Sequence, residues 1–231
     1  MTQTPRPSMR ERFREQVREQ ILDSAEAQIS QLGAAGLSLR AIARENGMAP
    51  SAIHRYFTNR DDVVTALMVR EFGALGDAID AAETAVAPRT DYSARIRAVF
   101  LAQREWALSK PHSWFLLFGS LVPDYTEPHE VCDAGNRFVF TMVRIVADMA
   151  AAGLTGAQPP TAVDVPAQAL VHVADLDAVP NWQVATGFAA YSWMCGAITA
   201  ELRGMYADFV ADNKAIYDAG IDHWLAAFGL E

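Results

Sequence analysis

Helical periodicity dominates this chain and restricts its fold more than any other feature. Apolar residues recur at spacings of three and four, as Val17, Ile21, Ala25 and Leu32 do within residues 11–32. That spacing places them on one face of an α-helix. No run of alternating β-branched residues indicates a strand. The sequence therefore predicts an all-α protein.

Glycine, proline and short polar pairs interrupt the periodicity and divide the chain into separate helices. The expected helices span residues 11–32, 38–46, 50–57, 60–86, 91–110, 128–152, 181–205 and 212–228. Residues 112–122 are aromatic-rich and form either a short helix or a loop. Residues 153–180 hold three clusters of Gly and Pro and are expected to form a loop, with or without a short helix near 166–174.

Composition excludes several classes of protein. With 51% hydrophobic residues over 231 positions, the chain is not a disordered one, and it suits one large domain or two small ones. Its two cysteines, Cys132 and Cys195, are too few for a disulfide scaffold and are expected to be buried thiols in a reducing compartment. The first residues lack the apolar segment of a signal peptide, so we expect a cytoplasmic protein.

Residues 178–200 form an uncharged stretch of 23 residues that is long enough to cross a membrane. The stretch contains Pro180, Asn181 and Gln183 together with several hydroxyl side chains, which are costly in lipid. We therefore expect a helix buried in protein and no contact with a membrane.

Charge is distributed unevenly along the chain, whose net charge is −9. Residues 1–70 contain ten Arg and eight acidic residues, a balance of +2, whereas residues 71–231 contain nine basic and twenty acidic residues, a balance of −11. An acidic protein is a poor non-specific binder of nucleic acid. The arginines of the N-terminal segment can still bind DNA at one defined surface.

Residues 38–57 have the pattern of two short helices joined by a tight turn. Gly47 permits the sharp turn, and Ala43 is small where the two helices must cross. Ile53 and Phe57 are four residues apart, so they share the inner face of the second helix. The pattern predicts a helix-turn-helix.

The outer face of that second helix carries Ser51 and Arg55, flanked by Ala52 and His54. These side chains are small or polar, as a surface that enters a DNA major groove about 12 Å wide requires.

Residues 18–70 resemble the DNA-binding domain of the TetR family of transcriptional regulators. The resemblance is carried by four stretches in the expected order, at residues 21–25, 36–43, 47–57 and 59–64. It implies a set of DNA-binding residues: Arg40, Pro50, Ser51, Ala52, His54, Arg55, Tyr56 and Arg60.

Within that set the family pattern implies that Ser51, Ala52 and Arg55 face bases and that His54 and Tyr56 approach phosphates. Arg40 and Arg60 begin the two helices on either side, near the DNA backbone. Two positions depart from the family: Pro50 stands where Lys is frequent, and His54 where Tyr is frequent. Phosphate affinity would then depend more on arginine.

Arg10, Arg12 and Arg14 precede the motif. They either reach into a minor groove, where arginine is favoured, or pair with the glutamates between them along a solvated helix.

The resemblance also implies two domains. Residues 1–60 would bind DNA, with a flexible arm at 1–10, and residues 61–231 would bind a ligand and form a homodimer. The segment Trp193–Met194–Cys195–Gly196, with a Trp- and Phe-rich segment near Trp114, resembles the subgroup named for its WHG motif. The predicted dimer interface comprises Phe188, Tyr191, Ile198, Ile216 and Trp224. The alternative is that the uncharged helix is buried within the monomer.

Large apolar side chains of the central region form either a core or a pocket for an apolar or aromatic effector. The pocket residues we expect are Trp106, His112, Trp114, Phe115, Phe118, Phe138, Met142 and Trp193.

The sequence gives little indication of metal binding, nucleotide binding or catalysis. His129, Cys132 and Asp133 lie near one another on an expected helix, but no second His/Cys pair follows. No phosphate-binding loop or nucleophile motif is present. We expect no metal, no cofactor and no enzymatic activity.

The sequence thus predicts a ligand-responsive regulator, a repressor that a small molecule releases from a palindromic operator in double-stranded DNA. The alternative is a helical protein that binds small molecules and not DNA.

Overall fold

The computed structural model describes residues 8–119, 125–154 and 181–230, and the regular structure within these ranges is helical throughout. The α-helices are α1 (Met9–Leu32), α2 (Leu39–Glu45), α3 (Arg60–Thr84), α4 (Tyr92–Ser109), α5 (Pro111–Phe118), α6 (His129–Gly135), α7 (Arg137–Ala151), α8 (Asn181–Leu202) and α9 (Asn213–Ala227). Two short 3-10 turns are η1 (Ala34–Gly36) and η2 (Ile53–Arg55). The all-α prediction is confirmed, whereas the loop and short helix expected within 155–180 lie outside the described residues.

Side-chain caps fix where several helices begin. Ser38, Asn59, Asp91 and Asp212 each accept a hydrogen bond from a backbone N–H in the first turn of the helix that follows. Such caps satisfy donors that have no partner within the helix. They explain why the starts of α2, α3, α4 and α9 agree with the sequence prediction to within one residue.

The long helix α3 connects two hydrophobic cores. Its first half, from Val63 to Phe72, packs with α1, α2 and η2, and this unit is called the head below. Its second half, including Leu75 and Ile79, packs with α4, α7, α8 and α9, which are called the body. The proposed division at residues 60 and 61 remains a prediction, because α3 belongs to both cores.

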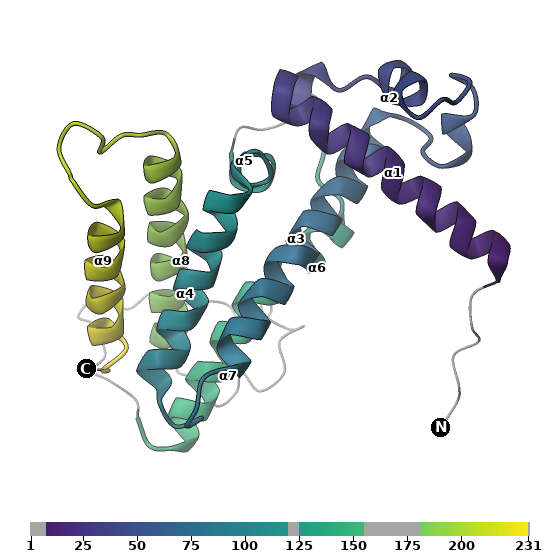
Figure 1. Cartoon of the computed structure of the whole chain (residues 1–231). Helices are drawn as coiled ribbons and strands as arrows, with labels where there is room; N and C mark the ends of the chain where they lie inside the picture. Colours follow the sequence, from purple (N-terminus) through teal and green to yellow (C-terminus); the bar gives the residue numbers. More distant parts are fainter. Residues whose placement is uncertain (1–7, 120–124, 155–180, 231) are drawn as a thin grey trace.

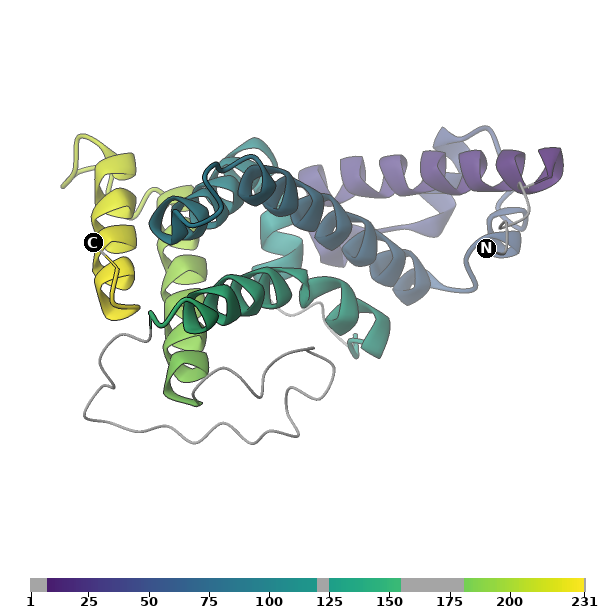
Figure 2. The same cartoon turned by 90° about the horizontal axis from the view of Figure 1, so that it is seen from below.

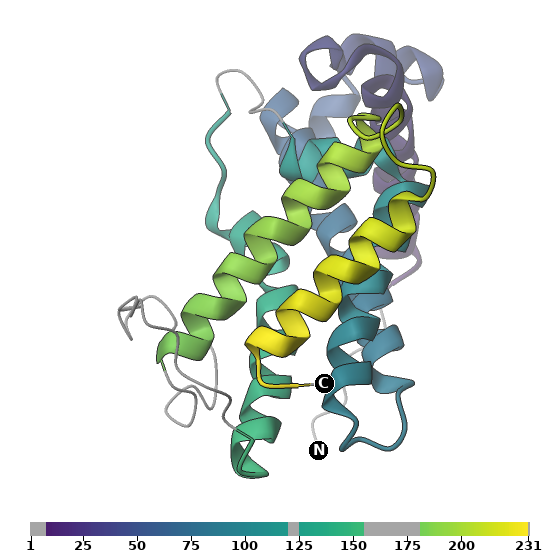
Figure 3. The ribbon, with the colours of Figure 1, turned by 90° about the vertical axis from the view of Figure 1, so that its left-hand side faces the viewer.

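The head and the outermost body helices lie at opposite sides of the molecule (Figure 1). Helices α3 and α4 run side by side, and α7 lies beneath them (Figures 1 and 2). Helices α8 and α9 form a layer on the side away from the head (Figure 3). They approach closely because Gly220 leaves room for the Trp193 ring, which a Cβ at that position would meet at 1.9 Å.

The predicted helix at 50–57 is wrong in its extent, since only the turn η2 forms there. Its backbone hydrogen bonds are mostly of the i to i−3 kind, such as Arg55 N to Ala52 O at 3.2 Å, and only Phe57 N reaches four residues back to Ile53 O, at 3.1 Å. This i to i−3 pattern is that of a 3-10 turn, and such turns are frequent in short connectors between helices.

The predicted helix at 128–152 is divided into α6 and α7 at Asn136, whose ψ is −9°. Gly135 and Asn136 both have low helix propensity.

A second correction concerns the two cysteines, which the sequence predicts to be buried: Cys132 is exposed, and Cys195 is half-buried. On α6 it is the neighbouring Val131 that faces the core, so Cys132 points to solvent.

No helix among the described residues is long and apolar enough to cross a membrane.

Candidate functional site

The turn between α2 and η2 has the tight geometry that the sequence predicts. The φ of Gly47 is +64°, a backbone conformation that favours glycine. Met48 N donates to Ala43 O at 2.8 Å, which returns the chain across the end of α2. The Asn46 side chain donates to Ser24 Oγ at 2.8 Å and so fixes the turn against α1.

The segment after the turn has an inner and an outer face. Ile53 and Phe57 are 1% and 3% exposed and anchor the segment in the head core. Pro50, Ser51, His54 and Arg55 are exposed, as is Arg40 on α2, whereas Ala52, Tyr56 and Arg60 are half-buried. Five of the eight residues predicted to contact DNA are therefore exposed on the head, and three are half-buried.

Those residues differ in how far their side chains are already engaged. Within the described part of the chain, the side chains of Arg40 and Arg55 make no hydrogen bond or ion pair. Arg60 Nη2 instead donates to Ala34 O at 2.6 Å, and His54 Nδ1 lies 3.0 Å from Thr58 O. Arg40 and Arg55 are therefore free to bind phosphates or bases, while Arg60 and His54 are held in the local structure.

The N-terminal arginines lie on α1. Among the described residues, Arg10, Arg12 and Arg14 form no ion pair with the neighbouring glutamates. Glu11 caps the helix by accepting from Ser8 N at 2.7 Å. Arg14 Nη2 donates to the Arg55 backbone carbonyl at 3.4 Å. The start of α1 therefore lies beside the outer face of η2, with its positive charges uncompensated.

Two further arginines of the head were not singled out from the sequence. Arg44 is exposed in the last turn of α2. The Arg18 guanidinium lies 4.5 Å from the centre of the Phe57 ring, and this cation–π contact packs α1 against the residues that follow η2. The spacing of Arg10, Arg14 and Arg18, each four residues from the next, was the available signal for a shared helix face.

Arg70 also belongs to the N-terminal seventy residues, and its side chain forms ion pairs within the protein. On α3, its guanidinium reaches Asp23 at 2.8 Å and Glu26 at 2.6 Å on α1, and Glu71 at 3.2 Å beside it. Lys110, after α4, reaches Glu71 at 2.9 Å and Glu26 at 3.7 Å. Burial alone would lower the pKa of Arg70, but the hydrogen bond to Asp23 and the nearby carboxylates raise it.

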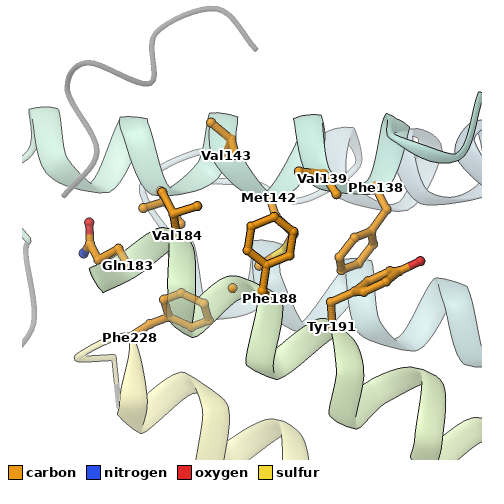
Figure 4. Close-up of a pocket in the computed structure, with 11 residues that line it drawn as sticks. Phe138, Val139, Met142, Val143, Gln183, Val184, Phe188, Tyr191 and Phe228 are labelled. Carbon is orange, nitrogen blue, oxygen red and sulfur yellow. The ribbon is translucent and has the colours of Figure 1, made fainter. Parts of the chain in front are cut away.

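A second candidate site is a cleft between α7 and α8. Its volume is about 40 Å³, and its wall is almost entirely apolar (Figure 4). Phe138, Val139 and Met142 come from α7, and Val184, Phe188 and Tyr191 from α8, with Phe228 at the end of α9. A smaller cavity of about 10 Å³ adjoins it and shares Phe138 and Tyr191.

Some of the predicted pocket residues line the cleft or the smaller cavity, and the others do not. Phe138 and Met142 line the cleft, and Phe118 lines the smaller cavity with Phe138. The others lie elsewhere: Trp106 and Trp114 are in the body core, Trp193 stacks on Tyr217 at 5.4 Å, Phe115 packs at the edge of the core, and His112 is exposed. Sequence reasoning missed Gln103 and Gln183, which line the smaller cavity and the cleft.

The residues predicted for the dimer interface differ in how far their side chains are exposed. Phe188 and Ile216 are 42% and 38% exposed, and Trp224 is half-buried. Tyr191 lines the cleft. Ile198 is fully buried in the body core, so its side chain is not available to a partner chain.

Among the described residues, no group of three or more His, Cys, Asp or Glu side chains is placed to hold a metal ion.

Two family models match the chain. The model described as "Bacterial regulatory proteins, tetR family" matches residues 21–67, which cover the turn and its outer face. The model described as "Tetracyclin repressor-like, C-terminal domain" matches residues 96–224, most of the body. The likeness to the WHG subgroup stays a prediction.

Individual relatives and solved structures are similar to this protein over nearly its whole length. The HTH-type transcriptional regulator Rv1816 of Mycobacterium tuberculosis is 33% identical, over 95% of this chain and 95% of the relative. The crystal structure of the protein SCO4313 is similar with a TM-score of 0.73 and 29% identity, covering 96% of this chain and 100% of the other. A protein of unknown function from Rhodococcus sp. RHA1 shares the fold, with a TM-score of 0.71, 24% identity and coverage of 92% and 95%.

Proposed function

The chain belongs to the TetR family of bacterial transcriptional regulators, and from that premise we propose that it is a homodimeric repressor of its target genes. Two heads, one from each subunit, bind a palindromic operator, and a small apolar or aromatic molecule bound in the body releases the DNA. A regulator of chromosomal DNA acts in the cytoplasm, and no enzymatic step is part of this function.

The observation that carries the proposal is the outer face of η2. Ser51 and Arg55 are exposed beside the turn, and Arg40 is exposed on α2, which packs in the same head. A guanidinium that has no partner in the protein can donate two hydrogen bonds to guanine in a major groove. We assign Arg55 to base recognition and Arg40 to phosphate contact.

Dimerisation through the layer of α8 and α9 supports this arrangement. Exposed Ile216 and the half-buried Trp224 lie on α9, and burial of apolar surface drives association. A two-fold dimer places its two heads on half-sites related by the same symmetry, about one helical turn of DNA apart.

The release of DNA requires that the body influence the head. Helix α3 contributes to both cores, and Arg70 and Lys110 join α1 to α3 and to the end of α4. A ligand that moves α4 or α7 would therefore tilt the head and change the spacing of the two heads. Ligand and DNA then favour different conformations, which is the requirement for allosteric release.

The test is operator affinity, measured by fluorescence anisotropy with DNA from upstream of the protein's own gene. Arg55→Ala is expected to weaken specific binding by about 1–3 kcal/mol, or about 5- to 150-fold, because it removes a base contact. The control is Arg144→Ala, which removes the same charge from an exposed position on α7. Equal affinity of the Arg55 variant and the wild type would remove Arg55 from the recognition surface.

One alternative is favoured by a specific residue. Pro50 is exposed at a position where the family often has Lys, so a phosphate contact is missing. A protein that binds small molecules and not DNA would show no operator binding at low salt while still binding ligand, and the same titration distinguishes the two.

A further inference from the structure

A buried glutamine in the body has no hydrogen-bond partner. Gln103 on α4 is 0% exposed, and within the described residues neither its carboxamide nitrogen nor its oxygen is paired. Burying an unpaired amide costs free energy, so native proteins almost always satisfy such groups. An exception inside a cavity points to a ligand that completes it.

The cavity around Gln103 is small and mostly apolar. Its volume is only about 10 Å³, about the room that one water molecule needs, and its wall includes Phe72 and Ile79 on α3, Phe118 on α5 and Phe138 on α7. The Gln103 carboxamide is the unpaired polar group in this wall. A placed polar group of this kind is what gives a ligand site its specificity.

Phe138 and Tyr191 separate this inner cavity from the α7–α8 cleft. Both side chains line both spaces, and their ring centres are 5.0 Å apart. Figure 4 shows the two rings together at one end of the cleft, with Gln183 at the other end. In this structure the two rings lie between the inner cavity and the cleft, so only a ligand that displaces them would join the two spaces.

The second buried glutamine has the same character as the first. Gln183 is 1% exposed and lines the cleft, and no described residue pairs with its carboxamide. The joined site would thus be apolar along its length, with a neutral polar group near each end.

The charges around the inner cavity are already compensated. Arg137 lies in its wall but pairs with Asp77 at 2.8 Å and Asp80 at 2.7 Å. The Tyr191 phenol is neutral at physiological pH, and burial raises its pKa further. A charged ligand group would be desolvated there without a free counter-charge.

We propose that the Gln103 cavity is the recognition end of the effector site. The effector is an uncharged, elongated apolar molecule whose hydroxyl or amide group exchanges hydrogen bonds with the Gln103 carboxamide. Phe138 and Tyr191 turn aside to admit it. This assignment rests on the proposed response to a small molecule and adds the chemical class of that molecule.

Calorimetric titration of the full chain tests the assignment with three probes of equal length: 1-decanol, decanamide and decanoate. The wild type is expected to bind the two neutral probes about tenfold or more tightly than decanoate. Gln103→Leu should weaken the neutral probes about tenfold or more and raise the melting temperature of the unliganded protein. Gln31→Leu, the same change at an exposed position on α1, is the control and should alter neither affinity.

Gln103→Met keeps the length of the side chain and repeats the test should the leucine variant fold poorly. Equal or tighter binding of decanoate, unchanged binding by the Gln103 variants, or binding of none of the probes up to their solubility would overturn the inference. Operator binding measured on the same samples separates these failures from a failure of the proposed function, which would remove operator binding in the wild type as well.

Discussion

At the scale of single residues, buried charged side chains in the body form ion pairs with specific partners. Arg104 on α4 donates from Nε to Glu201 Oε2 on α8 at 2.8 Å and from Nη2 to Oε1 at 2.5 Å. The two side chains are only 10% and 11% exposed. The hydrogen bond and the charge of Glu201 raise the pKa of Arg104 despite its burial. This pair therefore ties the inner helix α4 to the outer helix α8.

Glu201→Leu is expected to destabilise the fold by about 3–5 kcal/mol, because it leaves the Arg104 charge buried and unpaired. The double variant Arg104→Met/Glu201→Leu should recover most of that loss, since a buried ion pair is often replaceable by apolar residues. Urea unfolding at one fixed chain concentration measures both. A single variant as stable as the wild type would mean that the pair contributes nothing.

Single residues also mark where sequence reasoning reached its limit. The outer face of η2 could be predicted because Ile53 and Phe57 define the inner face by their spacing. The pocket could not be predicted in detail: Trp114 and Trp193 are as apolar as Phe138, and only packing decides which of them borders empty space. Gln103 was missed because a lone glutamine in a helix resembles any residue of a solvated face, and Gln183 was considered only as a polar residue that is costly in lipid.

At the scale of elements, helix starts were predictable where a capping side chain precedes them, as at Ser38 and Asn59. The type of a very short element was not. Residues 50–57 show a helical pattern, yet their backbone hydrogen bonds close mostly at i−3 and form only the turn η2. The break at Asn136 was missed because Gly135 and Asn136 reduce helix propensity without excluding a helix.

Helix α1 is an element whose first turns bear on DNA binding. Arg10 and Arg14 lie on one face of α1, and Arg14 touches the backbone of Arg55. Arg12 lies on the opposite side of the same helix. We expect Arg10 and Arg14 to contact phosphates beside the groove that η2 enters.

The double variant Arg10→Ala/Arg14→Ala should reduce the slope of log affinity against log salt by about 0.9 for each lost phosphate contact, about 1.8 in total. Arg12→Ala is the matched control and should leave the slope unchanged. An identical slope for the double variant and the wild type would show that the start of α1 does not touch DNA.

For the whole molecule, the connection between head and body is an ionic cluster on a shared helix. Arg70 and Lys110 hold the acidic side chains of α1 and the buried Glu71 together. The cluster lies where the head core meets the first turn after α4. We expect it to determine how firmly the head is fixed to the body.

Arg70→Met should increase amide hydrogen exchange in α1 and α2 while leaving α8 and α9 as protected as before, because local stability depends on local contacts. Arg97→Met is the matched control, since Arg97 pairs with Asp222 on α9 at the far side of the body. Uniform changes across both units, or none in α1, would contradict the proposed role of the cluster.

The charge balance also acts at the scale of the whole molecule. The N-terminal seventy residues carry +2 and the remainder −11, so we expect the body to repel DNA and the outer surface of the head to bind it. Part of the positive charge of the head is neutralised by the ion pairs that Arg70 forms with acidic side chains. Specific binding then depends on a few exposed arginines, and non-specific binding should be weak.

The central claim is that two heads of one dimer bind two half-sites of a palindromic operator. A hydroxyl-radical footprint of the wild type on the DNA upstream of its own gene tests it most directly. We expect two protected segments related by two-fold symmetry on one face of the duplex, about one helical turn apart or a multiple of it. A single unpaired protected segment, or no protection at low salt, would contradict the account.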